Sequence, residues 1–212
     1  MPRPFTVLFD ACLWNETVTH DHYMVTREVE WGGTTNHISI AELQPKRLRG
    51  KSHTESHEIL EDMRRIAQLA ETGRIRLYDT IELTFEWMGR PMGPWRKGEF
   101  DLFKNVTVSR LKPPVERSVV FSGFDSHDDF KDQKRRWLES IQEPRFLELK
   151  RVIYRKHWAD AFHLWTAEVH QLDCLLTLEK KFRNNLESQK KLTSKVRILS
   201  PSELSERFTP RL

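Results

Sequence analysis

The sequence predicts an α/β domain, with a central and mainly parallel sheet flanked by helices on both faces. Short apolar runs such as FTVLF (Phe5–Phe9) and LDCLLT (Leu172–Thr177) are typical of buried parallel strands. Segments with helical spacing of apolar residues separate these runs, and strands that alternate with helices form parallel sheets. The length of 212 residues suits a single domain with a substantial core.

The first half of the chain contains a hairpin between the first strand and the first helix. Tyr23–Trp31 alternates between apolar and more polar residues, Gly32-Gly33 follows, and Asn36–Ala41 is again strand-like, which predicts a β-hairpin. The next expected elements are a helix over Ser56–Glu71 that stops at Gly73, a strand over Arg74–Tyr78, and a helix over Ile81–Met88 capped by Thr80.

The second half begins with a loop rich in glycine and proline and ends in a regular alternation of elements. The loop is Gly89–Gly98. The expected elements after it are strands over Val106–Val108 and Ser118–Phe121, helices over Asp128–Ile141, Arg145–Ile153 and Trp158–His170, a strand over Leu172–Thr177, a helix over Glu179–Leu192, a strand over Val196–Leu199, and a capped turn at SPSEL.

The composition narrows the classes of protein. No apolar run is long enough to cross a membrane, and the N-terminus does not read as a signal peptide, so we expect a cytoplasmic protein without membrane contact. Cys12 and Cys174 have no metal-ligand spacing and are expected to be reduced, buried side chains. A net charge of +4 and a pI near 9.1 are compatible with a polyanionic partner.

Four acids are expected to meet at one edge of the sheet, because ligands of open parallel sheets bind beyond the carboxyl ends of the strands. Asp10 ends the first strand, Glu86 lies on the helix after the RIRLY strand, Asp160 opens the helix before LDCLLT, and Glu179 follows that strand. Carboxylates are the ligands that Mg²⁺ prefers, and carboxylates crowded without a cation would repel one another.

Several segments resemble PIN domains, a family of metal-dependent ribonucleases. The stretch WADAFHLWTAEVHQLDCLLTLEKKF (Trp158–Phe182) is similar to the C-terminal half of the family, and VLFDACLW, LYDTIELTFEW and VRILSPSEL are similar to its first strand, middle strand and helix, and last strand. The likeness does not cover 22–41 or roughly 89–141. Residues 1–212 would therefore form one PIN-like three-layer domain with an inserted hairpin (22–41) and a middle insertion or elaboration (89–141).

The resemblance implies an activity and assigns residues to it. Asp10, Glu86, Asp160 and Glu179 would be catalytic and hold Mg²⁺ or Mn²⁺, with Thr177 as a supporting hydroxyl. Family members are typically ribonucleases, and many are toxins that form dimers and are covered by an antitoxin protein. Two positions depart from the family pattern. Glu179 replaces the usual Asp, and Cys12 stands where Asn or Ser is common.

Each candidate also has a simpler interpretation. Asp10 could cap a turn, Asp160 could favour the helix dipole, and Glu179 could be a solvated residue of a first helical turn. Glu82 lies one turn before Glu86 and could be the inward acid instead. His163 invites a general-base role, but a packed or hydrogen-bonded core histidine is the more common case. Four other histidines are not spaced as zinc ligands are, and we interpret them as structural: His53, His57, His157 and His170.

Basic and aromatic side chains suggest contacts with a nucleic acid. The loop residues Lys46, Arg47, Arg49 and Lys51 could bind phosphates or be simply solvated. Lys134, Arg135 and Arg136 with Trp137 could combine charge with base stacking, but a solvated helix face is the preferred interpretation. Core or interface positions are expected for the tryptophans Trp31, Trp87, Trp95 and Trp158.

The sequence therefore predicts a metal-dependent endonuclease that hydrolyses phosphodiester bonds, with RNA preferred over DNA as substrate. An antitoxin-like protein and a second copy of the chain are further candidate partners. One alternative is a catalytically weakened PIN-like scaffold that binds nucleic acid or protein. Another is an unrelated α/β domain whose acids are scattered over its surface.

Overall fold

A five-stranded, entirely parallel sheet forms the centre of the protein. The computed structural model describes residues 3–45, 53–88, 101–118, 127–188 and 193–209. The sheet has the order β5-β4-β1-β6-β7 and comprises β1 (Phe5–Phe9), β4 (Ile75–Thr80), β5 (Val108–Leu111), β6 (Cys174–Leu176) and β7 (Arg197–Leu199). The first strand is thus central, paired with strands from both halves of the chain.

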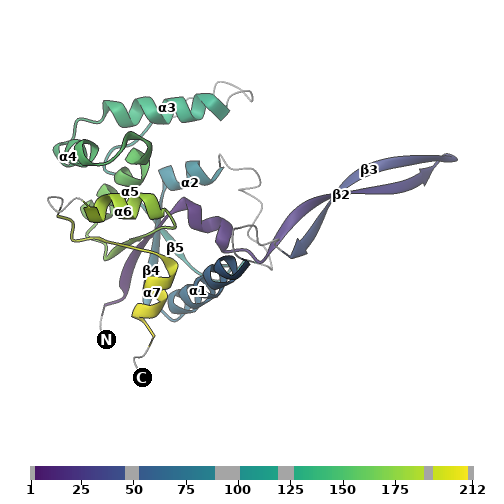
Figure 1. The fold of residues 1–212 in the computed structure, drawn as a ribbon, viewed down its shortest axis with the longest axis horizontal. Coiled ribbons are helices and arrows are strands. Elements are labelled where there is room, and N and C mark those ends of the chain that lie inside the picture. Colours follow the sequence, from purple (N-terminus) through teal and green to yellow (C-terminus); the bar gives the residue numbers. More distant parts are fainter. Residues whose placement is uncertain (1–2, 46–52, 89–100, 119–126, 189–192, 210–212) are drawn as a thin grey trace.

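Helices cover both faces of this sheet, which confirms the expected three layers (Figure 1). One face carries α1 (His53–Glu71) and α7 (Pro201–Arg207), together with the 3-10 turn η1 (Ala11–Glu16). The helices on the other face are α2 (Ile81–Met88), α3 (His127–Ser140), α4 (Pro144–Val152), α5 (Trp158–Val169) and α6 (Lys180–Ser188), with the 3-10 turn η3 (Arg155–His157) before α5.

The alternation of side chains along β1 explains the two cores. Val7 and Phe9 are buried against the α1 face, where Met63 and Ile66 pack, while Leu8 is buried against the α5 face with Phe162. A strand that is apolar on both faces can occupy only the middle of a sheet between two helical layers. The run FTVLF therefore specifies the central position of β1.

Local sequence signals also determine where helices begin. Thr80 accepts a hydrogen bond from the Leu83 amide (3.3 Å), and Ser200 forms a reciprocal capping box with Glu203. Gly73 follows α1 with a φ of 71°, which favours glycine at a helix end. All three positions were predicted from the sequence.

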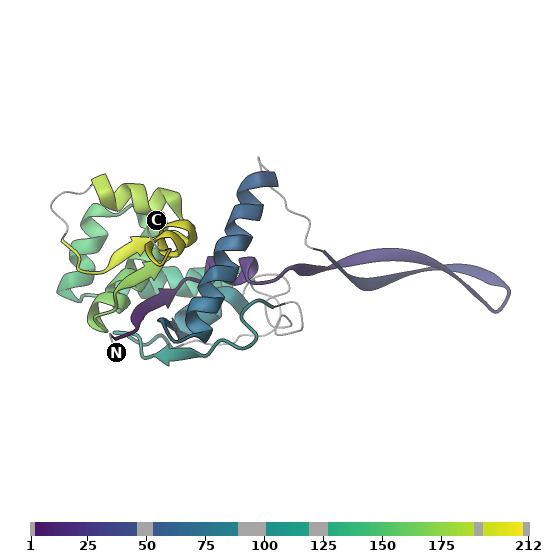
Figure 2. The ribbon, with the colours of Figure 1, turned by 90° about the horizontal axis from the view of Figure 1, so that it is seen from below.

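The hairpin consists of β2 (His20–Trp31) and β3 (Thr34–Pro45), which pair with each other over their full length in a separate two-stranded sheet. The predicted hairpin is thus confirmed, and it is longer than expected. The ribbon projects away from the helices and the main sheet (Figure 2).

The middle of the chain differs most from the expectation. The strand predicted over Val106–Val108 begins instead at Val108 and continues to Leu111, because it pairs with Leu77–Thr80 of β4. Most of the strand predicted over Ser118–Phe121 lies outside the described residues, as does the Gly89–Gly98 loop. No helix in the described part of the chain is long and apolar enough to cross a membrane.

Candidate functional site

Asp10 occupies the carboxyl end of the central strand and is held there by two side chains. Its amide donates to the Leu176 carbonyl (3.1 Å), which joins it to β6. The Thr177 hydroxyl donates to Asp10 Oδ2 (2.5 Å), and the Cys12 thiol lies 3.1 Å from the same oxygen. Asp10 is 5% exposed, so it is a buried carboxylate with fixed orientation.

Cys12 links the two strand ends as a neutral group. Burial, reinforced by the Asp10 charge, raises the pKa of the Cys12 thiol, so the sulfur keeps its proton and can donate it to Asp10. The Leu178 amide in turn lies 3.4 Å from Cys12 Sγ. The Cys12 thiol therefore fills the place of a polar side chain, although sulfur is a weak hydrogen-bonding group.

Asp160 lies in the first turn of α5, near Asp10. Burial and the neighbouring Asp10 charge raise the pKa of Asp160 to about 6, and Glu86 adds to this effect. The ring of His157 opposes it, with Nδ1 at 3.0 Å from Asp160 Oδ2. Three acids that are distant in sequence thus lie close enough for their charges to interact.

Glu86 on α2 is the third acid, and two basic groups bind it. His163 Nε2 lies 2.8 Å from Glu86 Oε1, and the Lys134 ammonium forms an ion pair with the same oxygen. Burial would raise the pKa of Glu86, but Lys134 and His163 outweigh burial and hold it well below its usual range. Glu86 is therefore a carboxylate in this arrangement, with its charge already balanced by Lys134.

His163 is a buried, hydrogen-bonded core residue, which agrees with the interpretation preferred from the sequence over a general base. Burial by itself would lower its pKa, but the Glu86 carboxylate outweighs burial and raises the pKa. The histidine thus bridges α5 and α2.

Glu82, the alternative inward acid of α2, points to a different partner. It is 1% exposed, and Arg117 binds it with Nη2 at 3.1 Å from Oε2. Burial raises the pKa of Glu82, and Arg117 opposes that shift. Of the two glutamates, Glu86 is the one whose charge acts on Asp160.

Of the remaining predicted site residues, Glu179 adjoins the cluster through its backbone, and the others lie outside the described residues. Glu179 is exposed, and its amide donates to the Thr177 hydroxyl (3.1 Å). The four residues predicted to bind nucleic acid are outside the described residues: Lys46, Arg47, Arg49 and Lys51. Among the residues described, no group of three or more His, Cys, Asp or Glu side chains is arranged closely enough to hold a metal ion by itself.

Two residues of the cluster were not recognised from the sequence. Lys134 was assigned to a solvated helix face, which is wrong, because its side chain is about one-fifth exposed and is paired with Glu86. His157 was interpreted as structural, but it is the partner of Asp160. The i, i+3 spacing of His157 and Asp160 was the only sequence signal for that contact.

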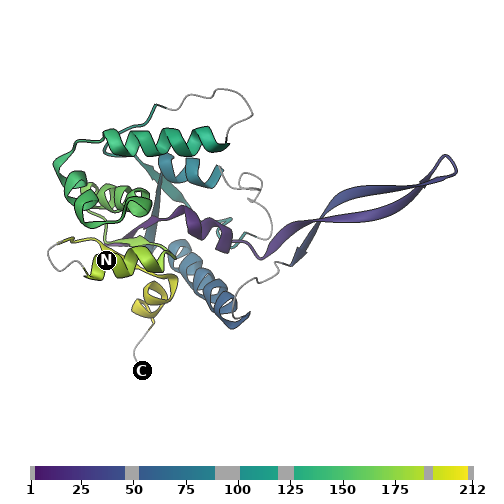
Figure 3. The same ribbon diagram turned by 45° about the horizontal axis from the view of Figure 1, so that its top comes forward.

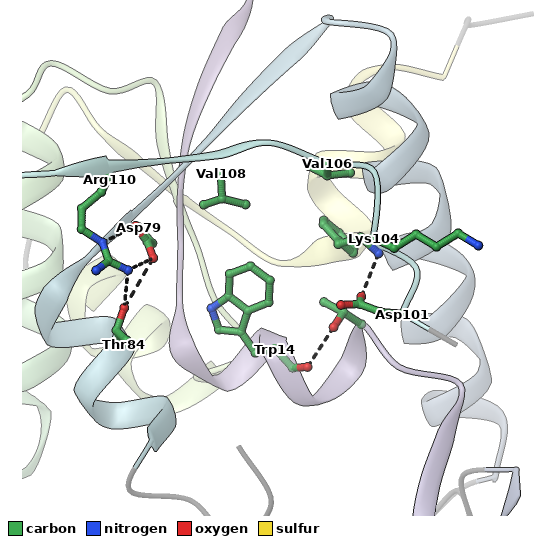
Figure 4. Close-up of a pocket in the computed structure, with 10 residues that line it drawn as sticks. Trp14, Asp79, Thr84, Asp101, Lys104, Val106, Val108 and Arg110 are labelled. Carbon is green, nitrogen blue, oxygen red and sulfur yellow. Dashed lines mark hydrogen bonds and ion pairs between the residues drawn. The ribbon is translucent and has the colours of Figure 1, made fainter. Parts of the chain in front are cut away.

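A cavity of about 510 Å³ is lined by residues of η1, α2, β4, β5 and the segment 101–106 (Figure 4). Trp14 and Val108 contribute apolar walls. At one end Arg110 donates to Asp79 (2.9 Å) and Thr84 (2.8 Å), so these polar groups are already paired with one another. The cavity is separate from the cluster of Asp10, Glu86 and Asp160.

Comparison with known proteins does not identify a function for this cluster of residues. No family model, curated protein or solved structure matches the chain. Its functional interpretation therefore rests on the residues described above.

Proposed function

We propose that the protein is a metal-dependent endonuclease that hydrolyses RNA, and that Asp10 and Asp160 hold the metal ion. The observation that carries this proposal is the approach of two carboxylates from distant parts of the chain, of which Asp10 is buried and Asp160 is partly buried. Asp10 and burial together raise the pKa of Asp160 to about 6, so the pair is under electrostatic strain at neutral pH. A divalent cation would relieve that strain.

The donor set fits a hard cation that keeps much of its own water. Mg²⁺ is commonly bound through one or two carboxylates, with water completing its shell, and Mn²⁺ accepts similar oxygen ligands. Asp10 and Asp160 supply two such carboxylates without requiring a closed cage of protein ligands. A bound ion would polarise a phosphoryl oxygen and lower the pKa of an attacking water molecule.

The surrounding residues of the chain orient the carboxylates and supply positive charge. Thr177 and Cys12 fix Asp10, and His157 fixes Asp160. The Lys134 ammonium and the His163 ring lie beside Glu86, at the same cluster. Positive groups aimed at a phosphodiester stabilise the charge that builds up as it is attacked. Glu86 would join as a further ligand if Lys134 moved to the substrate.

The distribution of charge favours a polyanionic substrate for the main part of the protein. The hairpin segment 20–45 carries Arg27 against four acids, a net charge of −3, whereas the whole chain has a net charge of +4. All the remaining residues together therefore carry +7. Such an excess attracts the phosphate backbone of RNA or DNA without selecting a sequence.

The test is cleavage of labelled single-stranded RNA with Mn²⁺, with Mg²⁺ and with a chelator. We expect cleavage only with metal, and a loss of at least roughly a hundredfold in the Asp160→Asn variant, since the metal supplies most of the charge stabilisation. Asp79→Asn is the matched control, because Asp79 lies near the same sheet edge but pairs with Arg110. Cleavage that survives both the chelator and Asp160→Asn would refute the assignment.

A binding protein without catalytic activity is the second candidate. It is favoured by the exposure of Glu179 and by the ion pair that already neutralises Glu86. Calorimetric titration with Mn²⁺ separates the two functions. Binding heat that disappears in Asp160→Asn, together with intact RNA under all conditions, would favour the scaffold.

A further inference from the structure

One face of the hairpin gathers most of its apolar side chains, and several of them are exposed in the described part of the chain. Side chains alternate between the two faces of a strand, and the register pairs Tyr23 with Glu42, Arg27 with Ile38 and Trp31 with Thr34. One face, called the apolar face below, therefore carries Tyr23, Val25, Arg27, Val29, Trp31, Ile38, Ile40 and Glu42, together with Thr34 and Asn36 near the tip. The opposite face is mostly polar, with residues such as Glu28, Glu30 and Ser39, and it also carries Met24 and Leu43.

Exposure concentrates on this ribbon. Of the eight large hydrophobic side chains that are exposed in the described part of the chain, six belong to the hairpin. Val29, Trp31, Ile38 and Ile40 lie on the apolar face, with Trp31 at the tip 81% exposed, and Met24 and Leu43 lie on the opposite face. The other two are Tyr154, directly before η3, and Val169, at the end of α5. Figure 3 shows the ribbon standing clear of the helices, as the other two views do. The expectation of a core position for Trp31 is thus wrong, and an interface position remains.

An isolated two-stranded ribbon with an exposed apolar face is expected to bind a partner. A two-stranded sheet alone in water is marginally stable, and three or more strands with a shared apolar face are needed for independent stability. Contiguous exposed apolar surface marks an interaction site. The two strands are joined by a tight two-residue turn. Gly32 and Gly33 in this turn have φ of 62° and 76°, as tight hairpin turns require.

We propose that the apolar face binds the same face of a second copy of this chain, giving an antiparallel dimer of hairpins. Along β2 the apolar face has the order aromatic, valine, arginine, valine, aromatic, centred on Arg27. A two-fold contact requires a surface that is complementary to itself. With the ribbons antiparallel, Trp31 of each copy packs on Tyr23 of the other, and Val25 meets Val29.

The two-fold arrangement brings the Arg27 side chains of the two copies together, and the Glu42 carboxylate beside each of them offsets their repulsion. Arg27 and Glu42 form an ion pair within the apolar face, so that face brings no net charge to the interface. Glu28 and Glu30 lie on the opposite face and stay in water when the apolar faces meet. With a single arginine and four acids, the hairpin is poorly suited to nucleic acid or to an anionic membrane, both of which attract clusters of Lys and Arg.

The contact area indicates a reversible dimer. Strands of 12 residues extend about 40 Å, and a ribbon of two strands is about 10 Å wide. If each face is treated as a flat rectangle, two faces in contact bury roughly 800 Å² in total. Weak and transient complexes bury less than about 1,200 Å². We therefore expect association in the micromolar range, which depends on protein concentration and does not involve the acidic cluster.

Sedimentation velocity of the full chain over a wide concentration range tests this dimer. The wild type should pass from monomer to dimer, and Ile38→Lys should weaken association at least roughly tenfold, because it places a charge at the centre of the interface. Ser39→Lys is the matched control, since Ser39 is the next residue on β3 but lies on the opposite face. It should leave association unchanged.

Trp31→Thr provides a second variant at the tip, and far-ultraviolet circular dichroism establishes that each variant is folded. This variant should also weaken the dimer. A wild type that stays monomeric at every concentration overturns the proposal, and so does equal weakening by Ile38→Lys and Ser39→Lys. A monomer whose binding to single-stranded RNA falls in Trp31→Thr would instead assign the face to nucleic acid.

Discussion

Asp160 illustrates at the scale of a single residue how a functional group can oppose folding. Its carboxyl is partly buried near Asp10 and Glu86, and this burial and the neighbouring charges raise its pKa to about 6. In the unfolded chain an aspartate titrates near 3.9. The native state therefore binds more protons between about pH 4 and pH 6, and the stability of the metal-free protein falls as pH rises through that range.

Asp160→Asn should consequently stabilise the metal-free protein at neutral pH. The expected gain in the free energy of unfolding is up to about 3 kcal/mol at pH 7, and it should vanish below about pH 4, where the carboxyl is protonated in both states. Denaturant titrations at several pH values measure this difference. A variant that is less stable than wild type at pH 7 would show that the Asp160 charge is compensated within the protein.

The sequence identifies the acids of the cluster more readily than their partners. Asp10 follows an apolar run and Asp160 opens an amphipathic helix, so local pattern and sheet topology place both at one edge. Lys134 belongs to a polar helix with charges on several sides, and only the packing of α3 decides which of them turns inward. Residue pattern within one helix cannot supply that information.

At the scale of elements, α3 contributes a side chain that would compete with the proposed metal ion. The Lys134 ammonium is paired with Glu86, which keeps that carboxylate occupied and adds positive charge to the cluster. Both effects disfavour a cation. The boundaries of α3 were predicted to within a residue or so, but its role was not, because the contact joins residues 48 positions apart.

Lys134→Met should therefore increase the affinity for Mn²⁺. A nearby unit charge in a partly solvated site contributes on the order of 1–4 kcal/mol, so we expect a gain of roughly tenfold in calorimetric titrations. Lys131→Met is the control, since Lys131 is exposed on the same helix and its substitution removes the same charge. Weaker Mn²⁺ binding in Lys134→Met would mean that Lys134 supports the site rather than competing for Glu86.

At the scale of the whole molecule, the hairpin and the main domain are structurally separate. Neither buried core cluster contains a residue of β2 or β3. The two-residue turn and the alternating pattern were sufficient to predict the hairpin, because its pairing is local in sequence. Its projection into solvent could not be predicted, since an alternating strand usually places its apolar face against the core.

Replacing residues 22–43 with a short Gly-Ser turn should thus leave the main domain folded. The thermal midpoint is expected to change by less than about 4 °C, the shift that 1 kcal/mol produces in a domain of this size. Metal-dependent RNA cleavage should persist in this variant while association is lost. Global unfolding on excision, measured by circular dichroism, would show that the ribbon stabilises the domain.

The pairing of β1 with β6 has a consequence for the synthesis of the protein. The Thr177 hydroxyl that orients Asp10 lies 167 residues further along the chain, and Asp160 itself is only slightly nearer. A nascent polypeptide thus exposes Asp10 long before the other half of the centre has left the ribosome. The proposed nuclease activity can therefore arise only after Thr177 has been synthesised and β6 has paired with β1.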